Sequence, residues 1–194
     1  MSRLKKPILC ICEGASEKAY LQELNRYFDE EEIPLYCIPK PSNGGQYIRV
    51  RNTYRAVRKA NPKSTILIWV DWDRYKRNDE KDMDNYQKKP SDIPNFLFSV
   101  MNFEDFLSMH LEREDLNRWW ISCTSRNHFN SPSHSREYLH EFECLLGIHY
   151  VKGEVPICIT MRSLENLRMH QEESSIPFKC DFAEELFRLI KTVL

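Results

Sequence analysis

Residues 64–73 read Ser-Thr-Ile-Leu-Ile-Trp-Val-Asp-Trp-Asp, an apolar run that ends in two aspartates separated by one residue. Such an uninterrupted run of β-branched and aromatic residues is typical of a strand buried on both faces of a parallel sheet. A second short run of this kind, residues 7–12 (Pro-Ile-Leu-Cys-Ile-Cys), is followed directly by Glu13 and Gly14. The two runs therefore predict central strands that carry acidic residues at their carboxyl ends.

Helical patterns alternate with these strands. After a Gly-Ala-Ser turn, in which Ser16 is expected to cap a helix, apolar residues recur at helical spacing. This order of elements predicts an α/β fold with a mostly parallel, four-stranded sheet flanked by helices. The other elements predicted in this half are strands at 33–38 and 95–100 and helices at 46–61, 81–87 and 102–110.

The pattern changes beyond residue 112. We expect helices over 136–146, 163–173 and 182–193 and a strand over 155–160. The chain of 194 residues suits one domain, or one domain with a small appendage. We therefore divide it into an α/β domain, residues 1–111, and a mainly helical extension, residues 112–194, that can pack on the same core.

Composition limits the classes of protein to consider. The 28 Lys and Arg against 29 Asp and Glu give a net charge of −1, which argues against a protein that coats nucleic acid generally. No run approaches the length of a membrane span, and the apolar residues 8–12 are too few for a signal peptide. The seven cysteines are scattered and lack metal-ligand spacing, so we expect reduced thiols and a cytoplasmic protein.

Five carboxylates are predicted to gather at one edge of the sheet. Glu13 follows the first strand, Asp71 and Asp73 follow the third, and Glu17 and Glu104 stand in the first turns of helices. Residues i and i+2 of an extended segment point to the same side, and parallel strands end at one edge. Oxygen ligands without His or Cys favour Mg²⁺ or Mn²⁺, which offsets their repulsion. We predict Glu13, Asp71 and Asp73 as metal ligands, and Glu17 and Glu104 as additional ones.

Each of these acids also has a purely structural interpretation. An Asp-x-Asp pair after a strand need not bind metal, and Glu17 and Glu104 can simply complement the dipoles of their helices. His110 stands at a position suited to packing, so a core histidine is favoured over a ligand. The placement of all five acids at one edge favours the metal site over the separate structural interpretations.

A basic segment accompanies the acids. Residues 33–70 contain no Asp or Glu but several Lys and Arg, and three arginines of the second predicted helix are spaced i, i+4, i+7. Such a stripe can follow a phosphate backbone, although a solvated helix face remains the alternative. The predicted nucleic-acid contacts are Arg51, Arg55, Arg58, Lys76 and Arg77.

Three short motifs resemble those of a known family. Residues 12–20 (Cys-Glu-Gly-Ala-Ser-Glu-Lys-Ala-Tyr) resemble the E-G-x-[ST]-E-x-x-Y opening of RloB-like proteins. These belong to the Toprim superfamily of topoisomerases, primases and OLD-type nucleases. Residues 70–73 are similar to its D-x-D, and residues 98–106 with His110 to its serine-led F-E-x-[WF] segment. Residues 100–102 depart from that segment, in which Asn and Pro would be expected.

The resemblance implies a Toprim fold and Mg²⁺-dependent phosphodiester chemistry. Asp71 and Asp73 would hold the metal, Glu13 would act as ligand or general base, and Lys18 would neutralise charge in the transition state. Related Toprim proteins are often encoded beside ABC- or SMC-like ATPases and act as nuclease effectors of anti-phage defence, some against tRNA. The implied partners are therefore a nucleic acid, DNA or RNA, and an ATPase.

Two other functions stay open. A Toprim site can also perform nucleotidyl transfer or strand rejoining, but no companion domain or tyrosine suited to these reactions stands out. The second is a non-catalytic regulatory or interaction subunit of an ATPase-containing defence complex. The chain has no Walker A motif, so any dependence on ATP would have to come from the partner.

Overall fold

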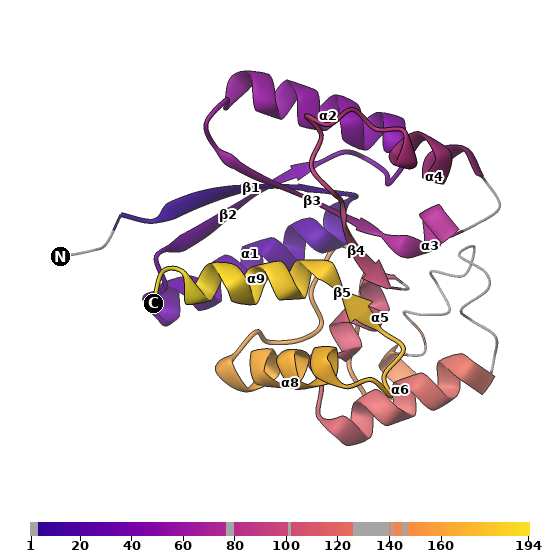
Figure 1. The fold of residues 1–194 in the computed structure, drawn as a ribbon. Coiled ribbons are helices and arrows are strands. Elements are labelled where there is room, and N and C mark those ends of the chain that lie inside the picture. The colour runs from indigo at the N-terminus through magenta and orange to yellow at the C-terminus, as the bar shows by residue number, and fades with distance from the viewer. Residues whose placement is uncertain (1–3, 77–79, 101, 126–139, 141, 145–146) are drawn as a thin grey trace.

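A single five-stranded sheet forms the centre of the molecule (Figure 1). The computed structural model describes residues 4–76, 80–100, 102–125, 140, 142–144 and 147–194. The strand order is β2-β1-β3-β4-β5; the first four strands run parallel, and β5 is antiparallel to β4. The strands are β1 (Lys6–Cys12), β2 (Leu35–Pro41), β3 (Thr65–Asp71), β4 (Leu97–Val100) and β5 (Lys179–Cys180).

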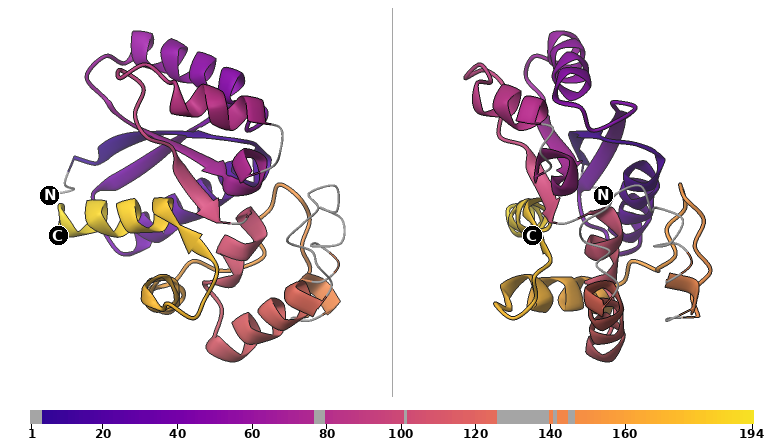
Figure 2. Two further views of the ribbon diagram at one scale, coloured as in Figure 1. Left: turned by 45° about the vertical axis from the view of Figure 1, so that its right-hand side comes forward. Right: turned by 90° about the vertical axis from the view of Figure 1, so that its right-hand side faces the viewer.

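Helices cover both faces of this sheet (Figures 1 and 2). On one face lie α1 (Ala15–Glu30) and α9 (Asp181–Lys191), and on the other α2 (Tyr47–Ala60) with α4 (Glu80–Gln87) beside it. Further helices with described bounds are α3 (Trp72–Lys76), α5 (Phe103–Ser108), α6 (Arg113–Ser125) and α8 (Met161–Glu172). Among the helices described, none combines the length and the apolar character that a membrane crossing needs.

The burial of β1 explains its continuous apolar sequence. Ile8, Cys10 and Cys12 point into the core cluster that contains α1, whereas Leu9 and Ile11 point into the cluster that contains α2. Alternate residues of a strand face opposite sides, so a strand covered on both sides has no solvent-facing positions for polar residues. This confirms the α/β sheet with helices on both faces.

Residues beyond 112 contribute side chains to the hydrophobic core that packs against the sheet. The cluster that contains α1 also contains apolar side chains of α8 and α9. Trp69 of β3 stacks on Phe182 of α9, with ring centroids 4.2 Å apart and an interplanar angle of 9°. His110 is buried nearby, and its ring accepts or donates a hydrogen bond of 2.9 Å with the Tyr20 hydroxyl. Its ring packs edge-on against Phe106 and Tyr20, as expected for a core histidine, and burial lowers its pKa to about 4.

Several local predictions need correction. The sheet has a fifth strand, β5, whose two residues are too few to produce a period-2 pattern. Residues 155–160 form no strand. Gly14, not Ser16, is the N-cap of α1, so the helix begins two residues earlier than a cap at Ser16 would place it. The helix expected over 136–146 lies mostly outside the described residues.

The outer edge of β2 is covered by a side chain and by prolines. The Asn25 side chain of α1 accepts a 2.7 Å hydrogen bond from the Cys37 amide and donates one of 2.8 Å to the Cys37 carbonyl. Residues 39 and 41 share the outward orientation of Cys37, and both are prolines without an N–H group. The Leu35 amide, which also faces outward, donates to the Ile33 carbonyl.

Candidate functional site

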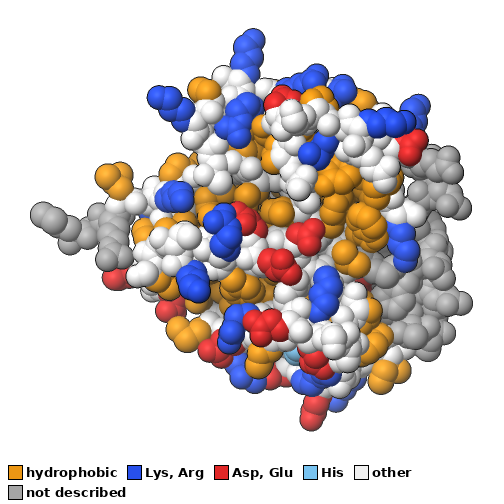
Figure 3. All heavy atoms as spheres, viewed as in Figure 1, with side chains coloured by type: hydrophobic (Ala, Val, Ile, Leu, Met, Phe, Trp, Pro, Cys, Tyr) orange, Lys and Arg blue, Asp and Glu red, His pale blue; other side chains and the backbone are white. Residues whose placement is uncertain are grey.

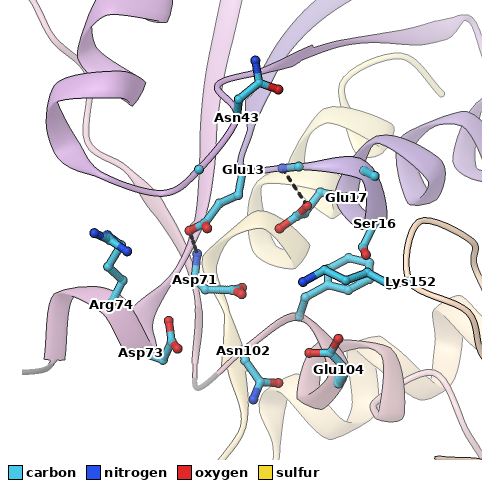
Figure 4. A pocket seen from close by; sticks show the side chains of 14 residues that line it. Glu13, Ser16, Glu17, Asn43, Asp71, Asp73, Arg74, Asn102, Glu104 and Lys152 are labelled. Carbon is cyan, nitrogen blue, oxygen red and sulfur yellow. Dashed lines mark hydrogen bonds between the residues drawn. The ribbon is translucent and has the colours of Figure 1, made fainter. Parts of the chain in front are cut away.

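The strand order places a crevice between β1 and β3. The chain leaves β1 towards β2 on one side, and leaves β3 towards β4 on the other. Ligands of open α/β sheets bind outside the carboxyl ends of the strands at such a switch point. A cavity of about 500 Å³ opens here, and Figure 4 shows the side chains in its walls. The five predicted carboxylates all line it: Glu13, Glu17, Asp71, Asp73 and Glu104.

Glu13 lies at the centre of the switch point. Its Oε1 accepts a hydrogen bond of 2.9 Å from the backbone amide of Asp71, at the end of the neighbouring strand. Burial, followed by the nearby charge of Glu17, raises the pKa of Glu13 to about 8. A carboxyl group with this pKa can exchange a proton near neutral pH.

The two aspartates reach the cavity from different elements. Asp71 is the last residue of β3, and Trp72 already begins α3, so Asp73 belongs to a helical turn. The prediction that both stand in one extended segment was therefore wrong, although both line the cavity. Burial and the neighbouring charge of Glu13 raise the pKa of Asp71 well above its usual range.

Glu17 and Glu104 have structural partners as well as a place in the cavity. The Gly14 amide donates a 3.1 Å hydrogen bond to Oε2 of Glu17, which closes the first turn of α1. The Tyr150 hydroxyl donates to Oε1 of Glu104 at 3.3 Å. Burial raises the pKa of Glu17, and it raises that of Glu104 to about 7. Glu17 therefore bonds the N-terminus of its own helix and also lines the cavity.

Two cations that the sequence patterns did not single out line the same cavity. Lys152 reaches it from the segment after residue 147, and its side chain points inward in Figure 4. Arg74 follows the second aspartate, and its Nε donates to Oδ2 of Asp82 at 2.9 Å. Lys18, the lysine predicted from the first motif, is exposed on α1 and does not line the cavity.

The positions of some cavity-lining residues in the chain, next to a motif or after a strand, could have indicated them. Arg74 stands next to the Asp-x-Asp pair, and Asn43 and Gly44 follow β2, which ends at the same edge as β1. Asn102, which also lines the cavity, precedes α5 as its N-cap. No pattern marks Lys152, because only the tertiary fold brings residue 152 to α1.

The carboxylates are the right type of ligand for a hard divalent cation, but they do not stand close enough together to hold one. The acidic donors of the cavity are all oxygens, which suits Mg²⁺ or Mn²⁺. Within the described ranges, however, no three His, Cys, Asp or Glu side chains stand close enough to hold a metal ion. Glu13, Glu17 and Glu104 each use one carboxylate oxygen in a hydrogen bond to another group, which leaves the second oxygen of each as the candidate ligand.

The predicted basic stripe lies on α2, where Figure 3 shows Lys and Arg side chains over the upper part of the molecule. Arg55 is exposed. Arg58 instead donates to the carbonyls of Pro62 and Ser64, at 3.1 and 3.0 Å, and so closes the end of the helix. The Arg51 guanidinium lies over a tyrosine ring of the preceding turn, 5.9 Å from its centroid. Lys76 is exposed at the end of α3, and Arg77 lies outside the described residues.

No model of a protein family, no curated protein and no solved structure matches the chain. Function is therefore inferred from the cavity and its chemistry.

Proposed function

We propose that the cavity is the site of a Mg²⁺- or Mn²⁺-dependent nuclease that hydrolyses phosphodiester bonds of DNA or RNA. The observation that carries the proposal is the pairing of five carboxylates with two cations in one cavity at the switch point of a parallel sheet. Carboxylates suit a divalent ion, and the cations suit the phosphate groups of a substrate. The similarity of the sequence motifs to Toprim proteins points in the same direction.

Asp71 and Asp73 would hold the ion, with Glu104 or Glu17 as a further ligand. Their crowding supports this assignment, because burial and mutual repulsion already disfavour the charged form of Asp71. When bound, the ion supplies charge that polarises a phosphoryl oxygen and lowers the pKa of water. The protein's contribution is to fix the carboxylates at the ends of β3 and α5.

Glu13 is the candidate proton acceptor of the site. Its Oε1 is engaged by the Asp71 amide, which fixes the direction of the carboxylate and leaves Oε2 to take a proton from the attacking water. Lys152 and Arg74 would bind the non-bridging phosphate oxygens. Arg55, on the helix that begins three residues after cavity-lining Gly44, would extend the contact along the backbone of the nucleic acid.

The proposal includes a partner. By analogy with Toprim effectors of anti-phage defence, an ABC- or SMC-like ATPase would control the site, since the chain itself lacks a Walker A motif. A purely regulatory subunit would not need carboxylates and cations gathered around one cavity. The cavity therefore favours the catalytic proposal over the regulatory alternative.

The test is cleavage by the purified chain. Labelled single- and double-stranded DNA, RNA and tRNA are incubated with Mg²⁺, with Mn²⁺ or with EDTA. We expect cleavage with either ion, none with EDTA, and none by the Asp71→Asn variant, whereas Asp84→Asn, which changes an exposed aspartate of α4, retains activity. Cleavage only after addition of a co-purifying ATPase would indicate a gated effector. Cleavage of none of these substrates under either condition would contradict the proposal.

A further inference from the structure

We infer that the loop between β2 and α2 positions the Glu13 carboxylate, and that Gly45 and Tyr75 are the residues through which it acts. The inference depends on the proposed function of the cavity only for the second experiment below, which measures metal binding. Neither residue belongs to the predicted motifs, and neither would touch a substrate: they act through Glu13.

Gly45 lies directly against the carboxylate. A Cβ atom at this position would stand within 2.5 Å of Oε1, Oε2 and Cδ of Glu13, closer than real Cβ contacts. No side chain can therefore occupy position 45 while Glu13 keeps its place. Oε1, the atom nearest to such a Cβ, is also the atom that accepts the 2.9 Å hydrogen bond from the Asp71 amide. Glu13 is thus held by both the backbone of the loop and the end of β3.

Tyr75 holds the loop in this position. Its hydroxyl donates a hydrogen bond of 2.9 Å to the Gly45 carbonyl, and the residue is only 2% exposed. The ring packs edge-on against Phe98, with centroids 5.2 Å apart, so the hydroxyl is supported from the core. Burial also removes Tyr75 from the set of residues that could contact a phosphate at the rim of the cavity.

Backbone hydrogen bonds tie the same loop to the end of β1. The Ser42 amide donates to the Cys12 carbonyl at 2.8 Å, and the Gly44 amide donates to the Glu13 carbonyl at 2.9 Å. The loop therefore follows the backbone of Glu13 as well as its side chain. Because position 45 has no Cβ, the carboxylate of Glu13 can lie against the backbone of the loop, and the loop then fixes its position.

The first experiment measures the hydrogen bond itself. Hydrogen exchange of the Asp71 amide, resolved by NMR, reports whether Oε1 of Glu13 still accepts from it. We expect exchange at least about tenfold faster in Gly45→Ala than in the wild type, approaching the rate in Glu13→Ala. The matched control is Gly14→Ala, whose Cβ would lie at an ordinary 3.8 Å from Glu17 and should leave the Asp71 rate unchanged. An unchanged Asp71 rate in Gly45→Ala would overturn the inference, whatever the cavity binds.

The second experiment asks whether the positioning matters for a metal. Affinity for Mn²⁺ alone is measured by titration calorimetry for the wild type, Gly45→Ala, Glu13→Gln and the double variant. We expect Gly45→Ala to weaken binding about tenfold, and to weaken it no further once Glu13 is replaced. Equal weakening in both backgrounds would show that the loop acts on the fold rather than through Glu13, and would overturn the inference.

Tyr75→Phe provides a milder variant in case Gly45→Ala folds poorly. It keeps the ring and removes the hydroxyl, so we expect about fivefold weaker Mn²⁺ binding and a faster Asp71 exchange. If the wild type binds no Mn²⁺, the proposed function fails, and the exchange experiment still decides whether Gly45 and Tyr75 position Glu13.

Discussion

Oε1 of Glu13 and the backbone amide of Asp71 are joined by a 2.9 Å hydrogen bond that links the ends of β1 and β3. The bond lowers the cost of burying a carboxylate at the switch point, yet burial and Glu17 still raise the pKa of Glu13 to about 8. The centre of the cavity is therefore an acid whose proton is easily gained or lost near neutral pH.

Asp71→Asn should separate activity from stability. We expect cleavage to fall by two to three orders of magnitude, on the order of several kcal/mol of transition-state stabilisation. In metal-free buffer the same variant should gain about 1 kcal/mol in free energy of unfolding, because Asn is neutral in both states, whereas burial of Asp71 disfavours its charged form. Cleavage assays and urea denaturation in EDTA measure the two effects. A loss of stability together with full activity would contradict both expectations.

Without metal, the protein should become less stable as the pH rises from about 4.5 to about 8. Glu13 has a pKa of about 8 in the folded chain against a reference of 4.5, so in this window the folded state holds a proton that the unfolded chain releases. The free energy of unfolding then falls with rising pH. Glu104, whose pKa is raised to about 7, adds to the same trend.

Thermal unfolding in EDTA between pH 5 and 8.5 checks this prediction. Glu13→Gln and Glu104→Gln should each flatten the decline in melting temperature, because neither amide titrates. The stabilising shift produced by added Mg²⁺ should grow with pH, since binding requires ionised carboxylates. A melting temperature that rises across this range would be incompatible with the raised pKa values.

Arg55 and Arg58 should behave differently although both belong to the basic stripe. Arg55→Glu should weaken nucleic-acid binding at every sequence and reduce the slope of log affinity against log salt by about one. Arg58→Glu should instead cost about 2 kcal/mol in free energy of unfolding, because Arg58 closes the end of α2. Fluorescence anisotropy at several salt concentrations and chemical denaturation distinguish the two. Equal effects of both substitutions on binding alone would argue against this division of roles.

Lys152→Met should reduce cleavage about tenfold, mainly through weaker substrate binding, because an ammonium group is removed from the cavity wall. Lys88→Met, which changes an exposed lysine after α4, is the matched control and should have little effect. Lys18→Met tests the lysine that the sequence motif indicated. A larger loss of activity from Lys18→Met than from Lys152→Met would favour the motif over the cavity.

The elements that are buried on both faces could be predicted from the sequence. β1 and β3 have continuous apolar runs because both sides of these strands are covered, and α2 was expected within one residue of its observed ends. The two-residue β5 could not be predicted, since its place depends on pairing with Ser99 and Val100 of a distant segment. Residues 155–160 look like a strand because Ile157 and Ile159 alternate inward, yet they pack without a strand partner.

The acidic side of the cavity was predictable, and its basic side was not. Glu13 follows β1 and Asp71 ends β3, and chain order alone places strand ends at one edge of a parallel sheet. Lys152 comes from a segment without a regular pattern, attached where the Gly153 amide donates to the Ser16 hydroxyl at 3.3 Å. Such a contact depends on tertiary packing, which local patterns do not encode.

The side-chain amide of Asn25 takes the place of a neighbouring strand at the outer edge of β2, because it accepts from the Cys37 N–H and donates to the Cys37 carbonyl. The prolines at positions 39 and 41 have no N–H group, so this edge of β2 presents few free hydrogen-bond donors to another strand. Copies of the protein are thereby prevented from joining edge to edge into a continuous sheet, a route to aggregation. Self-association, where it occurs, has to use a surface other than the β2 edge.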